Sequence, residues 1–135
     1  MVKKLKIIFS LLVISTFCFA GCTNSSDCYV QGLVSLSQNQ KEKAIKHFEK
    51  SIKSGSSVEV LLSLQELKKL NVNPNKMLKL TKLAIDSKKN PQAEIFNYYV
   101  QSLVDNQKYE KVIKLVPGLL AQNLNVKKDW LQYCM

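Results

Sequence analysis

Apolar residues recur at intervals of three and four along most of the chain, which is the spacing of one face of an α-helix. The clearest stripe lies between residues 41 and 53 and consists of Ala44, Ile45, Phe48 and Ile52. Comparable stripes predict helices over residues 27–37 and 57–70, and others that begin near 74, 91 and 108. No segment alternates between apolar and polar residues as a half-buried strand does. The pattern therefore predicts an all-α domain of about six or seven helices in antiparallel pairs joined by short turns.

Glycine, proline and asparagine divide these stripes. Gly55 ends the second predicted helix, because glycine readily adopts the left-handed conformation at a helix end. The Asn-Pro pairs at 73–74 and 90–91 are typical helix starts, with asparagine as the cap and proline in the first turn. Pro117 is expected to interrupt the helix that begins near Lys108, because proline lacks the amide donor that a helix interior needs.

Four residues of the first two predicted helices, Gly32, Ala44, Phe48 and Ser51, follow the spacing of a known repeat. They resemble one unit of the tetratricopeptide repeat, a 34-residue helix pair in which small residues allow close helix approach and an aromatic residue fills the space between units. Weaker copies follow at Met77, Thr81 and Ala84, and at Val100, Val112 and Val116. The segment from Ala44 to Gly55 also resembles Sel1-like repeats.

The resemblance covers about residues 28–120. It implies a short α-solenoid of about three antiparallel helix pairs plus a C-terminal capping helix that contains Trp130 and Tyr133. An unrelated helical bundle is the alternative, because any helical hairpin carries apolar stripes at similar spacing. Proteins of the repeat family bind partner peptides on the face formed by the first helix of each pair. The residues that the resemblance places on or near that face are Gln31, Ser35, Gln65, Lys69, Asn97 and Tyr98.

The first 22 residues have the features of an export signal. Lys3, Lys4 and Lys6 precede an apolar run that ends at Phe19. The tetrad Phe-Ala-Gly-Cys that closes with Cys22 resembles a lipobox, although its first position is usually leucine. The resemblance implies a lipoprotein signal peptide at 1–21, a lipidated (palmitate-bearing) Cys22 with a tether over 22–27, and the helical domain over 28–135.

Two alternatives to this arrangement remain open. One is an ordinary secretory signal cut after Ala20, and the other is a retained membrane helix. The apolar run is about 13 residues long, which is short for a helix that needs roughly 20 to span a bilayer. Under all three interpretations the chain leaves the cytosol. The absence of aspartate after Cys22 favours the outer over the inner membrane if the cell has two.

The chain carries a net charge of +10, and all 20 of its basic residues are lysine. Nucleic-acid recognition usually relies on arginine, so a nucleic-acid partner is not expected. The lysines are instead expected to form a solvated face that could favour an anionic lipid surface. Cys28 and Cys134 are the candidates for a disulfide, which requires a last helix that folds back or a closed bundle. Pairing between molecules and burial as free thiols are the alternatives.

Nothing in the sequence indicates catalysis, a cofactor or a metal site. His47 is the single histidine, and no second ligand lies at a spacing that suits metal binding. The sequence predicts an envelope lipoprotein that acts as a protein–protein scaffold, with pilus, secretion or outer-membrane assembly as the roles that the resemblance implies. The alternatives are an exclusion- or immunity-type surface lipoprotein, a soluble secreted binding module, a protein that contacts lipid or peptidoglycan through its lysines, and a secreted hydrolase, which would need a polar pocket.

Overall fold

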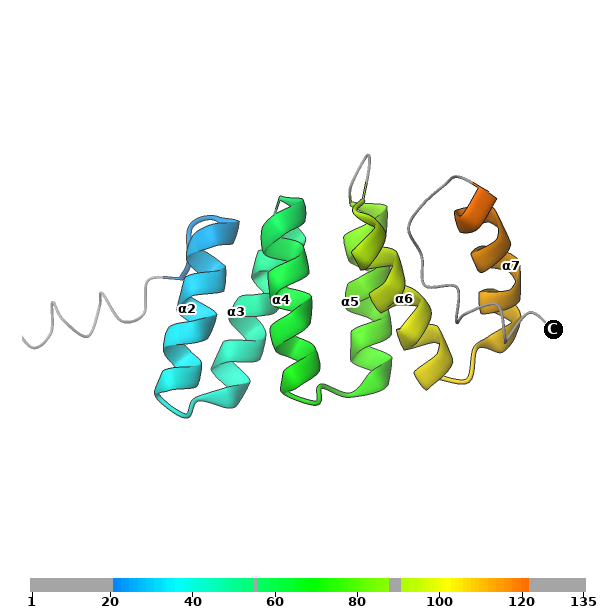
Figure 1. Ribbon diagram of the computed structural model, residues 1–135. Helices are drawn as coiled ribbons and strands as arrows, with labels where there is room; N and C mark the ends of the chain where they lie inside the picture. The colour runs from blue at the N-terminus through cyan, green and yellow to red at the C-terminus, as the bar shows by residue number, and fades with distance from the viewer. Residues whose placement is uncertain (1–20, 55, 88–90, 122–135) are drawn as a thin grey trace, which may run out of the picture.

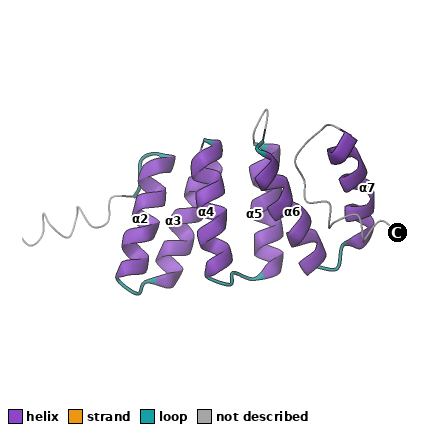
Figure 2. Cartoon of the chain, viewed as in Figure 1, coloured by secondary structure: helices purple, strands orange, loops and turns teal. Residues whose placement is uncertain are grey.

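The computed structural model describes residues 21–54, 56–87 and 91–121. Within them the chain forms helices and loops only, and Figure 2 shows no strand in the described part. The helices are α2 (Ser25–Ser37), α3 (Lys41–Ser54), α4 (Ser57–Lys69), α5 (Pro74–Asp86), α6 (Ala93–Asp105) and α7 (Tyr109–Ala121). The prediction of an all-α protein is confirmed for this part of the chain.

Asparagine side chains cap two of these helices. The side chain of Asn24 accepts the amide hydrogen of Asp27 at 2.9 Å at the start of α2. The side chain of Asn73 accepts the amide hydrogen of Asn75 at the same distance at the start of α5, where Pro74 occupies the first turn. Both caps satisfy amides that have no partner inside the helix.

One turn geometry occurs three times, between α2 and α3, between α4 and α5, and between α6 and α7. Its central residues, Asn39, Asn71 and Gln107, all have φ between 52° and 58°. In each turn the amide of the following residue bonds to a carbonyl five residues earlier, as Gln40 does to Ser35. This pair of features is the Schellman ending of a helix. The repetition places equivalent residues of α2, α4 and α6 in one register.

The helices stand side by side in a row from α2 at one end to α7 at the other (Figure 1). Each helix contacts the next along the row, although α4 and α5 touch less closely than α5 and α6 do. Alternate helices also touch, because α2 contacts α4, α3 contacts α5, and α4 contacts α6. Among the described residues the core consists of two clusters, a larger one across α3, α4, α5 and the start of α6, and a smaller one between α6 and α7.

Helices α2 and α3 approach closely where Gly32 faces the ring of Phe48. A Cβ atom on Gly32 would lie 2.7 Å from Cδ1 of Phe48, well inside van der Waals contact. Phe48 is fully buried and its ring centroid lies 5.9 Å from that of Tyr29. Beside this contact, the hydroxyls of Ser25 and Ser51 lie 3.0 Å apart, and each also donates to the other residue's carbonyl at 2.9 Å. Small residues therefore bring these two helices together.

Three helices differ by two residues or more from what the sequence predicts. The first helix begins at Ser25 rather than 27, so most of the predicted tether over 22–27 forms the cap and first turn of α2. Helix α6 begins at Ala93, after the predicted Asn-Pro start. Helix α7 passes through Pro117, where we expected a break. Val116 and Leu119 on either side are buried while Pro117 is exposed, so burial of this helix offsets the missing hydrogen bond.

Candidate functional site

A groove lies between α4 and α6 and encloses about 220 Å³. Its walls combine an aromatic ring and one leucine with amide and charged side chains. The lining residues are Leu61, Gln65 and Lys68 from α4, and Glu94, Asn97, Tyr98 and Gln101 from α6. Their spacing of three and four residues on each helix places them on one face of α4 and one face of α6. The groove can accept both apolar groups and hydrogen-bonding groups.

Tyr98 is the central side chain of this groove. Its ring packs against the larger core cluster, and the Nζ atom of Lys68 lies 5.7 Å from the ring centroid. Burial raises the pKa of the Tyr98 hydroxyl, and the nearby charge of Lys69 partly opposes that rise. The phenol therefore stays protonated and can act as a hydrogen-bond donor. Tyr98, Lys68 and Gln101 also line a second hollow of about 380 Å³, which extends towards the start of α5.

The structure brings together three of the six residues predicted for a partner-binding face. Gln65, Asn97 and Tyr98 all line the groove. Lys69 lies on α4 outside the groove lining, and its Nζ atom pairs with Glu66 at 2.7 Å. The side-chain hydrogen bond to Glu66, followed by the charge of that carboxylate, raises the pKa of Lys69.

The remaining two predicted residues lie on α2. Gln31 is half-buried, and its carbonyl accepts the hydroxyl of Ser35 at 2.9 Å. Ser35 is only 3% exposed, so its predicted place on an open face is wrong. The physical reason is the shared turn register, which makes Ser35 equivalent to the buried residues Leu67 and Leu103.

Sequence reasoning missed Leu61, Lys68, Glu94 and Gln101 in the groove. The sequence could have indicated two of them, because residues four apart lie on the same face of a helix. Gln101 follows Asn97 by four residues, and Leu61 precedes Gln65 by four. The residues predicted for repeat packing, by contrast, all lie in the interior. Gly32, Ala44, Phe48 and Ser51 are buried between α2 and α3.

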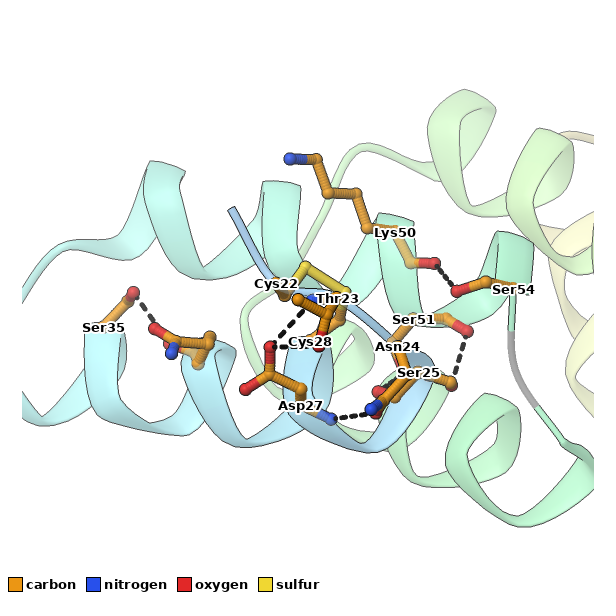
Figure 3. The surroundings of a disulfide bond; sticks show 11 residues. Cys22, Thr23, Asn24, Ser25, Asp27, Cys28, Ser35, Lys50, Ser51 and Ser54 are labelled. Carbon is orange, nitrogen blue, oxygen red and sulfur yellow. Dashed lines mark hydrogen bonds between the residues drawn. A yellow bond between two sulfur atoms is a disulfide. The ribbon is translucent and has the colours of Figure 1, made fainter. Parts of the chain in front are cut away.

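A second feature lies at the start of α2, where Cys22 forms a disulfide with Cys28 (Figure 3). The two Cα atoms are 4.8 Å apart, because six residues of chain turn back into the first turns of the helix. The amide of Thr23 donates to a carboxylate oxygen of Asp27 at 2.8 Å and holds this segment in place. Cys28 is 3% exposed. It pairs with Cys22 rather than with Cys134, which lies outside the described residues.

His47 lies on α3 and is partly buried. Burial lowers the pKa of its imidazole, and the positive charges of Lys50 and Lys43 lower it further. Within the described ranges no cluster of histidine, cysteine and acidic side chains has the arrangement of a metal site. The same part of the chain contains no helix with the length and apolar character needed to cross a membrane.

No protein-family model, curated protein or solved structure matches the chain. The functional argument therefore depends on the groove, the cysteines and the charged surface of the chain itself.

Proposed function

We propose that this chain is an exported protein–protein interaction module with the architecture of a short tetratricopeptide-like solenoid. In this proposal α2–α3, α4–α5 and α6–α7 are three antiparallel pairs, and α2, α4 and α6 form the binding face. The three matching turns and the contacts between alternate helices support it. The register supports it too, because Gly32, Leu64 and Val100 each lie seven residues before the central residue of a turn and are all buried.

The groove between α4 and α6 is the single observation that carries the binding role. Its amide side chains, Gln65, Asn97 and Gln101, can both donate and accept hydrogen bonds, as the backbone of a peptide requires. The ring of Tyr98 supplies apolar contact and a hydroxyl donor at the same place. A volume of about 220 Å³ suits one or two side chains of a partner rather than a large ligand. The proposed ligand is therefore a segment of another envelope protein.

A photo-crosslinking amino acid at Gln101 tests this binding face in cells that express the full chain. We expect Gln101 to give a discrete crosslinked product, and the same probe at Lys114, an exposed residue of α7 outside the groove, to give none. Adding Asn97→Arg should abolish the product, because the long cation fills the groove. Equal products at Gln101 and Lys114, or a product that Asn97→Arg leaves unchanged, would contradict the proposal.

In this proposal, acyl chains on Cys22 hold the module at the outer membrane. The lipobox-like tetrad that ends at Cys22 supports this anchor. The start of α2 at Ser25 leaves a tether of only two residues after that cysteine. A lipid anchor at this position would therefore hold α2 and α3 close to the bilayer. Pilus, secretion or outer-membrane assembly would suit a scaffold of this build.

The Cys22–Cys28 disulfide favours a second candidate, a soluble secreted binding module cut after Ala20. A lipid thioether and a disulfide both use the Sγ atom of Cys22, so one molecule carries one or the other. The intact mass of the native protein separates the candidates. A diacyl or triacyl increment that Cys22→Ala removes, together with a Cys28 thiol that alkylates after unfolding, supports the anchor. A chain that starts at Gly21 and gains two alkyl groups from these cysteines only after reduction supports the secreted module.

A further inference from the structure

Lysine recurs at the same two places on α3, α5 and α7. The register is given by Ala44, Met77 and Val112, which are buried and are each the fourth residue of their helix. A lysine stands one residue before each of these positions and another stands two residues after it. The six lysines are Lys43 and Lys46 on α3, Lys76 and Lys79 on α5, and Lys111 and Lys114 on α7.

These lysines are exposed, and on α3 Lys50 extends the row at helical spacing. In the described part of the chain, ion pairs join Lys69 to Glu66, Lys76 to Glu49 and Lys82 to Asp86. Lys43, Lys46 and Lys50 of α3 and Lys79 of α5 are among the lysines for which these pairs leave no acidic partner in the described residues. The ion pair between Lys76 of α5 and Glu49 of α3 joins the two helices beside Lys50 and Lys79, so we treat the four charges as one surface.

This lysine surface adjoins the segment where the proposed anchor would attach. A Cβ atom on Gly21 would lie 3.7 Å from Nζ of Lys50, and Gly21 precedes Cys22 directly. Figure 3 shows Lys50 on α3 close to Cys22 and Thr23. Any attachment through Cys22 therefore lies close to Lys50, one member of the lysine surface.

We propose that the lysine surface of α3 and α5, consisting of Lys43, Lys46, Lys50 and Lys79, docks on an anionic lipid bilayer. Lysine provides compact, strongly hydrated charges that attract phosphate without a fixed contact geometry, as a fluid array of headgroups requires. The charges spread over two helices that contact each other, α3 and α5, and line none of the hollows described above, which suits an extended surface. The inference rests on the proposed export to the envelope, but binding through these lysines requires no lipid on Cys22.

Vesicle sedimentation tests the docking surface separately from the anchor. The probe is the full chain with Cys22→Ser, mixed with vesicles of phosphatidylglycerol and phosphatidylcholine or of phosphatidylcholine alone. One variant changes the four surface lysines to glutamine. The matched control changes Lys41, Lys108, Lys111 and Lys114, which are exposed, lie outside the surface and have no ion pair among the described residues, so both variants have the same net charge. Thermal unfolding of both variants shows whether each remains folded.

Each lysine near an anionic surface raises the partition coefficient for the vesicles about fivefold. The partition coefficient of the surface variant should therefore be lower than that of the parent protein by up to several hundredfold. The control should lose far less, and 0.5 M salt should release the parent protein from the anionic vesicles. Equal losses in the two variants would show that net charge alone acts and would overturn the proposal. Absence of binding to the anionic vesicles would overturn it as well, including the case in which the lysines bind an acidic protein instead. Neither result affects the crosslinking or mass measurements that test the proposed function.

Discussion

Replacing Gly32 with alanine tests the packing of α2 against α3 most directly. The new Cβ atom would lie 2.7 Å from Cδ1 and 2.8 Å from Cζ of Phe48, and it would also meet Cε1. Carbon atoms pack at about 3.5–4.0 Å, so the ring must move by roughly 0.8 Å or more. Phe48 is completely buried and cannot turn into solvent. Overpacking of this kind costs about 1–3 kcal/mol of unfolding free energy.

Gly118→Ala provides the matched control, because a Cβ atom on Gly118 meets nothing within 4 Å. Both substitutions gain up to about 1 kcal/mol of helix propensity, so their difference isolates the overpacking cost. Urea unfolding followed by circular dichroism should place Gly32→Ala about 1–3 kcal/mol below Gly118→Ala, with similar m values. Phe48→Leu should relieve part of this cost in the double variant, as a non-additive term. If Gly32→Ala proved as stable as Gly118→Ala, the packing argument would be refuted.

Three further substitutions test other features of the fold. Ser51→Ala should cost about 0.5–1.5 kcal/mol because it removes the buried hydrogen bond from the Ser51 hydroxyl to the Ser25 carbonyl. The exposed Ser54→Ala should cost less than that in the same urea assay. Gln107→Gly should raise the free energy of unfolding by about 0.5–1 kcal/mol, because glycine adopts the positive φ of this turn without strain. The thermal midpoint should therefore rise, and an unchanged or lower midpoint would contradict this prediction. Because folding lowers the pKa of His47, the unfolded chain binds more protons at this residue than the folded chain does. The contribution of His47 to the free energy of unfolding is therefore complete above pH 6.5 and is lost as the pH falls through the lowered pKa. The fall in the urea midpoint between pH 7.5 and 5 should therefore be smaller in His47→Gln, and an equal fall would show that other groups cause it.

The sequence predicts the helices well where local signals act alone. Asn73 and Pro74 together cap and start a helix, and the structure places both as expected. Pro117 shows the limit of such signals, because its effect depends on tertiary burial of Val116 and Leu119 that no local window contains. Ser35 shows a second limit. Its polarity suggested an open surface, but its position in the turn register decides its burial, and a hydroxyl that donates to its own helix can be buried at little cost.

The candidate site was predicted only in part for a similar reason. Asn97 and Tyr98 stand out in the sequence as a dense polar and aromatic patch, and both line the groove. The sequence predicts Lys69 for this face, but its neighbour Lys68 lines the groove, because a shift of one residue rotates a side chain by about 100° around the helix. Assigning a groove between two helices requires the relative rotation of both, and apolar stripes determine that rotation only roughly.

The two proposed surfaces use different helices, and this separation has a functional consequence. The groove residues come from α4 and α6, whereas the free lysines come from α3 and α5. A bilayer that covers the lysine surface therefore need not cover the groove, so docking and partner binding can occur in the same molecule. The four lysine-to-glutamine changes should then leave the crosslink at Gln101 unchanged in a lipid-anchored protein, because the anchor still supplies membrane attachment. Loss of that crosslink would mean that the lysines contact the partner itself, and the separation of the two surfaces would have to be abandoned.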